Sequence, residues 1–135
     1  MIKNIKCGAR IILGLIYGVF GAMGLAMVLG LMTMPQPAMP EKAAAFMTGM
    51  MGSGYFLPLL KITETAGGIL LLTGIAAPVA LVILAPITVH IFLFHAYLTP
   101  GINEIILPLA MVILHVIAMS AYGDIYKPLF IHRKK

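Results

Sequence analysis

The sequence has 135 residues and a mass of 14.5 kDa; 61% of the residues are hydrophobic, only 10% are charged, and the mean hydropathy is +1.07. In a soluble domain about a quarter of the residues are charged, so this composition excludes a water-soluble globule. A spanning helix needs about 20 apolar residues, so four spans leave no room for a nucleotide-binding or other sizeable soluble domain. The net charge of +5 comes mostly from Lys and Arg near the two termini, beside hydrophobic segments, which favours a role in membrane orientation over nucleic-acid binding.

The first predicted span covers residues 11–32, an uncharged run that follows Lys3, Lys6 and Arg10. Its length exceeds that of a signal-peptide core and no convincing cleavage site follows it, so we expect a retained span. Small residues recur at every fourth position, which predicts a strip along which a second helix packs closely. The strip consists of Gly14, Gly18, Ala22, Ala26 and Gly30.

Residues 33–54 have a different composition. Three prolines between Thr33 and Pro40 prevent a helix there, because proline lacks a backbone donor and has a fixed φ. Residues 41–51 predict a short helix at the membrane interface, which the following glycines end.

Three further spans are predicted over residues 55–76, 79–98 and 104–122. The connection between the first two of these is tight: Gly74 ends one helix and Pro78 opens the next. Pro86 is expected to kink the span that contains it. The predicted fold is therefore all-α, a single domain of residues 1–135 forming a four-helix transmembrane bundle with a short interfacial segment between spans one and two.

The distribution of Lys and Arg predicts the orientation. Seven of the nine positive residues flank the termini, so the positive-inside rule places both termini in the cytoplasm. Tyr55 and Tyr97 then belong to the outer aromatic belt, and Tyr122 and Tyr126 to the inner one. His132 lies in the basic C-terminal tail and is expected to be solvated. The single cysteine, Cys7, excludes an intramolecular disulfide and is expected to be an ordinary free thiol.

Five ionisable side chains interrupt the last three spans: Lys61, Glu64, His90, His95 and His115. With a helical rise of ~1.5 Å per residue, they lie between roughly 5 and 16 Å below the outer boundary of the membrane. Lys61 and Glu64, three residues apart, share one helix face. Since ionisable residues in spans are costly and usually mark a site, we expect a small polar pocket that opens outward and is lined by these three spans.

Several kinds of site fit this pattern. The Lys61–Glu64 pair could be purely structural. A metal or haem site could use Glu64, His90, His95 and His115, although no HExxH or CxxCH motif supports it. Copper(I) could bind the thioethers, since eight of the eleven methionines lie between Met23 and Met51; methionine as apolar filler is commoner. A quinone or another lipophilic molecule could exchange protons with a histidine while Lys61 and Glu64 hold its polar end.

The segment from Gly54 to Gly74, GYFLPLLKITETAGGILLLTG, resembles the DoxX family of small integral membrane proteins, as do Pro78–Leu81, Leu84–Ile87 and Phe92–His95. The most specific parts are the Lys-x-x-Glu-x-x-Gly-Gly core and the later Phe-His. Many members carry asparagine where this chain has His90. The resemblance implies a four-helix bundle of the bacterial inner membrane with a loose link to redox metabolism, because the family is named after relatives associated with thiosulfate:quinone oxidoreductase.

Three functions are therefore compatible with the sequence. The leading hypothesis is a redox-associated membrane subunit that contacts quinone through the pocket and works with partner membrane or redox subunits. The second is a non-catalytic assembly or scaffold subunit, for which the small-residue strip of span one is the important surface. The third is a small-molecule carrier, which in so short a chain requires a homo-oligomer, at least a dimer, to build a pathway.

Overall fold

The computed structural model describes residues 1–131, so the predictions for His132 and the basic residues 133–135 lie outside the described residues. Within residues 1–131, four helices are long and apolar enough to cross a membrane: α1 (Ile2–Val28), α3 (Phe56–Thr73), α4 (Ala77–Tyr97) and α5 (Ile102–Ser120). Two shorter helices are α2 (Glu41–Gly52) and α6 (Gly123–Phe130). The predicted all-α four-helix bundle is confirmed, and the chain is a multi-pass membrane protein.

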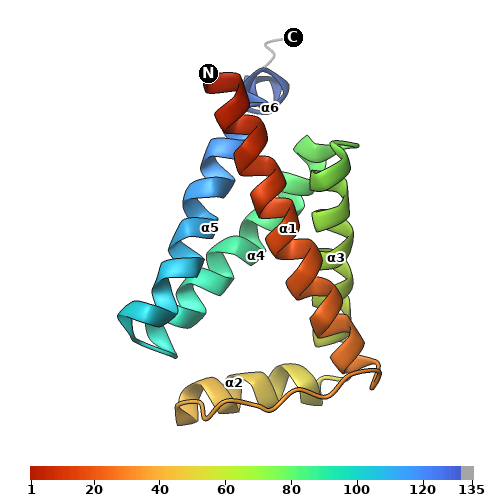
Figure 1. Cartoon of the computed structure of the whole chain (residues 1–135), viewed down its shortest axis with the longest axis vertical. Coiled ribbons are helices and arrows are strands. Elements are labelled where there is room, and N and C mark those ends of the chain that lie inside the picture. Colours follow the sequence, from red (N-terminus) through yellow and green to blue (C-terminus); the bar gives the residue numbers. More distant parts are fainter. Residues whose placement is uncertain (132–135) are drawn as a thin grey trace.

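The four long helices form a ring in which each packs against two neighbours. Helix α1 contacts α3 and α5, and α4 contacts the same two helices. At one end, α2 lies across the bundle, and we call this the α2 end (Figure 1). At the other, α1 begins beside α6, and we call this the terminal end (Figure 1). Large aliphatic side chains such as Leu15, Val82 and Ile113 are exposed along the ring, as expected of surfaces in contact with lipid.

The first helix is displaced toward the N-terminus relative to the predicted span. It begins at Ile2 and thus includes the basic residues before the uncharged run, because Lys and Arg are good helix formers whose charged ends can extend to the interface. It ends at Val28, where Gly30 adopts φ 71° and the Leu31 amide bonds the Ala26 carbonyl at 2.8 Å. This left-handed glycine is a Schellman-type stop, and it removes Gly30 from the helical strip.

The turn between α3 and α4 is built as predicted. Gly74 ends α3 with φ 78°, a conformation that costs glycine little. Ala76 follows with φ 50°, and Pro78 occupies the first turn of α4. The α6 helix, which the sequence did not suggest, packs beside this turn: the Tyr126 hydroxyl donates a 2.8 Å hydrogen bond to the Pro78 carbonyl. Partial burial, and to a lesser extent the neighbouring Tyr122, raises the pKa of Tyr126.

The small-residue strip of α1 is only partly as predicted. Gly14 and Gly18 do contact α3, and a Cβ added to Gly68 would meet the Gly18 backbone, 2.7 Å from its Cα. Ala22, by contrast, is exposed, and the contact with α3 continues through Gly21 and Gly24. A step of four residues rotates by about 400° around a helix, so a strictly four-residue strip drifts off the contacting face and a three-residue step restores it.

Candidate functional site

A partly open cavity of about 310 Å³ lies in the bundle toward its α2 end. Four of the five predicted site residues line it: Lys61, Glu64, His90 and His95. The remaining wall is mostly apolar and comes from every helix from α1 to α5, so the predicted lining by spans two, three and four was incomplete. The size is near the lower limit of ligand pockets, which are ~300–1,000 Å³ and typically apolar with a few polar groups.

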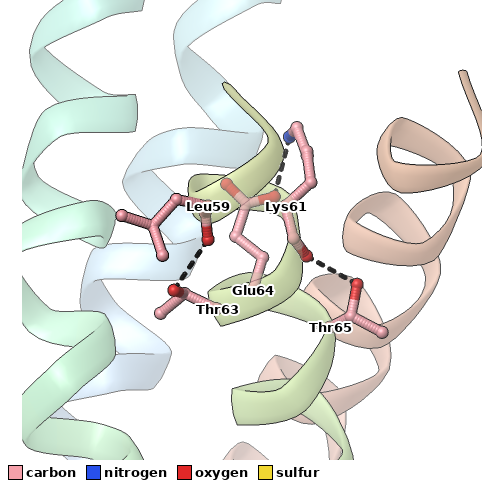
Figure 2. Close-up of polar contacts among 5 residues, drawn as sticks. All are labelled: Leu59, Lys61, Thr63, Glu64 and Thr65. Atoms are coloured by element: carbon pink, nitrogen blue, oxygen red, sulfur yellow. Dashed lines mark hydrogen bonds and ion pairs between the residues drawn. The ribbon is translucent and has the colours of Figure 1, made fainter. Parts of the chain in front are cut away.

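The charged part of the cavity is an ion pair within α3. Lys61 Nζ lies 2.7 Å from Glu64 Oε2, and the side chains are 22% and 5% exposed respectively (Figure 2). The stem of Lys61 passes over Gly24 of α1, where a Cβ would lie 2.7 Å from Lys61 Cε. Glycine at that position leaves space for the lysine stem. The pair is neutral overall, which limits the cost of holding it within an apolar bundle.

Hydroxyl side chains of α3 are satisfied locally and do not compete for the ion pair. Thr63 donates to the Leu59 carbonyl at 2.8 Å, and Thr65 donates to the Lys61 carbonyl at 2.7 Å (Figure 2). Thr65 also lies at the α1 interface, because a Cβ on Gly21 would be 2.8 Å from its Oγ1. Lys61 and Glu64 are thus the side chains through which α3 offers charge to the cavity.

The two histidines of α4 contribute in different ways. His95 is half-buried, and its Nδ1 donates to the Ile91 carbonyl at 2.9 Å, so in the neutral ring Nε2 is an acceptor. His90 is exposed on the isolated chain, and its ring lies 5.4 Å from that of Phe46 in α2. Phe46 also contacts the Phe94 ring at 5.7 Å. Helix α2 therefore closes part of the cavity with an aromatic contact to α4.

His115 does not reach the cavity, which separates it from the other predicted site residues. It is 4% exposed and its Nε2 donates to the Leu81 carbonyl at 2.9 Å. In the neutral ring Nδ1 is then an acceptor for Thr88 Oγ1, 2.7 Å away, and the Thr88 hydroxyl lies 2.6 Å from that of Tyr17. The result is a buried hydrogen-bond chain, Tyr17–Thr88–His115, that joins α1, α4 and α5.

Sequence reasoning missed Tyr17 and Thr88, although both interrupt otherwise apolar runs. A tyrosine or threonine inside a membrane bundle needs a hydrogen-bond partner, and this requirement could have linked them to the histidine of α5. Tyr17 also lines the cavity, as do Phe46, Met47 and Met50. The buried chain and the cavity thus meet at Tyr17.

The proposed metal ligands are not assembled into one site. Within residues 1–131, no group of three or more His, Cys, Asp and Glu side chains is placed to hold a metal ion. Met47 and Met50 line the cavity, while Met32, Met34 and Met51 are exposed. The geometry is that of an apolar cavity with one ion pair and two imidazoles.

The fold and the cavity define a multi-pass helical membrane protein whose mostly apolar cavity carries one ion pair and two imidazoles. The chain matches no protein-family model, and no curated protein or solved structure is detectably similar to it.

Proposed function

We propose that this chain is a DoxX-like subunit of the bacterial inner membrane whose cavity holds the head group of a quinone next to a redox partner. One observation carries the proposal: Lys61, Glu64, His90 and His95 line a single cavity whose other walls are mostly apolar. The motif similarity of residues 54–74 to the DoxX family supports the redox association.

The chemistry of a quinone head group suits these walls. Its ring is apolar and its two carbonyl oxygens accept hydrogen bonds, which the Lys61 ammonium and a histidine N–H can donate. Glu64, 2.7 Å from Lys61, can take up a proton when the reduced form gives one up, and His95 Nε2 offers a second acceptor. Electrons are exchanged with the partner subunit, while this chain binds the head group and handles protons.

The charge distribution supports an orientation with the termini in the cytoplasm. Lys3, Lys6 and Arg10 lie at the terminal end, on the first three turns of α1. The α2 end carries Glu41, Lys42 and Glu104, a near balance of charge. Under the positive-inside rule the cavity then lies toward the periplasmic side.

The assembly hypothesis has less support. Gly14 and Gly18, the residues expected to receive another protein, contact α3 of the same chain. Their small size is therefore already used within the bundle.

Quinone binding by charge-matched variants tests the proposal. A short-tailed benzoquinone and naphthoquinone are titrated into the purified full chain in micelles, and the Kd is measured by calorimetry. The double variant Lys61→Gln/Glu64→Gln removes the ion pair without leaving a lone buried charge. We expect its Kd to rise about 10-fold or more, because hydrogen bonds to charged groups contribute ~1.5–3 kcal/mol.

The control is Lys42→Gln/Glu104→Gln, which removes the same two charges from exposed positions at the α2 end. It should leave the Kd unchanged. Equal quinone affinity in the wild type and both doubly substituted proteins, or no measurable affinity in the folded wild type, contradicts the proposal.

A further inference from the structure

A second hollow, of about 520 Å³, lies at the terminal end, far from the α2 end. Three cations of α1 line it, Lys3, Lys6 and Arg10, and their spacing of three and four residues places them on one helix face. The opposite wall is the turn between α5 and α6, at Ala121 and Tyr122. The hollow therefore lies between two parts of the chain that are over 100 residues apart in sequence.

No carboxylate side chain of the sequence is available to neutralise these cations. The four acidic residues are accounted for elsewhere: Glu41 and Glu104 begin α2 and α5 at the opposite end, and Glu64 pairs with Lys61. Asp124, the one acidic residue of α6, pairs with Lys127 at 2.7 Å. Three positive charges thus surround a hollow without an acidic side-chain partner.

The local contacts hold two of the cations at the hollow. Lys6 Nζ donates to the Ser120 carbonyl at 3.0 Å, which fixes its ammonium beside the end of α5 and leaves further N–H donors. The Arg10 guanidinium lies against Gly74 at the end of α3, and its one hydrogen bond within residues 1–131 is a 3.9 Å contact to Cys7 Sγ. Most of its five donors are therefore open to an anion.

The location of the hollow at one end of the bundle favours the phosphate of a lipid head group over other anions. Ends of spanning helices lie at the level of lipid head groups, and basic pockets between such helices bind phosphate-bearing head groups. The apolar Ile2 lines the hollow and Ile5, on the same turn, is 54% exposed, so acyl chains can pack beside the charged part. We propose that Lys3, Lys6 and Arg10 form a binding site for an anionic phosphate group carried by a membrane phospholipid. This site is independent of the quinone cavity.

The test compares two proteins of equal net charge. Lys3→Gln/Arg10→Gln removes two cations of the hollow, whereas Lys42→Glu lowers the net charge by the same two units at the α2 end and leaves the Lys127–Asp124 pair intact. Lys6 is retained in both because it also bonds α5. Phosphatidylglycerol or phosphatidylcholine is added to the purified full chain, and the bound fraction is measured by native mass spectrometry.

Each cation near an anionic lipid contributes about fivefold to the affinity. The affinity for phosphatidylglycerol should therefore fall roughly 25-fold in the first variant and change little in the second. Phosphatidylcholine should bind weakly to all three proteins. Equal phosphatidylglycerol binding by the two variants, or phosphatidylcholine binding as tight as that of phosphatidylglycerol, overturns the site.

A competition arm identifies the source of the phosphate. If inorganic phosphate displaces phosphatidylglycerol from the wild type, and binds alone with the same dependence on Lys3 and Arg10, the hollow takes free phosphate. If it does not displace the lipid, the acyl chains contribute and the ligand is the phospholipid. Circular dichroism and size exclusion confirm that both variants remain folded.

Discussion

The two halves of the bundle are filled differently although the same four helices build both. Toward the terminal end, the centre of the ring is occupied by Leu13, Leu71, Leu81 and Leu84, all fully buried. Toward the α2 end, α3 and α4 diverge from their shared turn (Figure 1). The cavity lies there and is lined by side chains of helices α1 to α5. The two halves therefore differ in packing: side chains fill the centre of one, and a cavity remains in the other.

Residue size explains the difference. Near the turn, α3 carries Gly67 and Gly68, and a Cβ on Gly67 would lie 2.8 Å from Leu84 Cδ1. One and two turns earlier, the same helix carries Glu64 and Lys61, whose larger and polar side chains line the cavity. This change along one helix accompanies close packing of α3 against α4 near the turn and the cavity toward the α2 end, while α3 stays in contact with α1 throughout.

Matched truncations of leucine should give the largest contrast between the halves. Leu84→Ala empties a filled site and should destabilise the protein by about 2–5 kcal/mol. Leu60→Ala enlarges a cavity that already exists, so it loses less packing and should cost well under half as much. Thermal denaturation in one detergent, followed by circular dichroism, measures both. Similar losses would mean that the two halves are equally well packed.

An added methyl group tests the close packing of the filled half by itself, with a smaller expected effect. In Gly68→Ala the new Cβ meets the backbone of Gly18, which cannot rotate away, so α1 and α3 must move apart at a cost of about 1–3 kcal/mol. The control is Gly8→Ala in α1, where a Cβ has no neighbour within 4 Å. It should leave the denaturation temperature unchanged or slightly higher. A Gly68→Ala protein as stable as the control would rule out close α1–α3 contact.

The sequence predicts the fold well because the membrane imposes it. Hydropathy and length locate four spans, and the Gly74–Pro78 turn is determined by local backbone chemistry. The site is harder to predict, since counting residues gives the depth of a side chain but not its direction around the helix. His115 has a suitable depth yet faces Thr88 and Leu81, whereas Phe46 reaches the cavity from a segment outside the spans.

The boundary between the halves is the Tyr17–Thr88–His115 chain, and breaking it should have the smallest of the three effects. Thr88→Val keeps the shape of the side chain but leaves the Tyr17 hydroxyl and His115 Nδ1 without their partner. Side-chain hydrogen bonds inside membrane proteins contribute ~0.6 kcal/mol on average and up to about 1.7. Because two bonds between helices are lost at one buried position, together with the 3.0 Å contact of the Thr88 hydroxyl to the Leu84 carbonyl, we expect a cost of about 1 kcal/mol.

Thr63→Val is the matched control, because its hydroxyl bonds only the Leu59 carbonyl within the same helix. It should change the denaturation temperature far less. Quinone titration of Thr88→Val adds a readout that stability alone does not give, since Tyr17 also lines the cavity. If the hydrogen-bond chain positions Tyr17, the Kd rises while the Thr63→Val protein binds as the wild type does. If the quinone affinity is unchanged while the denaturation temperature falls, the hydrogen-bond chain stabilises the packing of α1, α4 and α5 and has no part in binding.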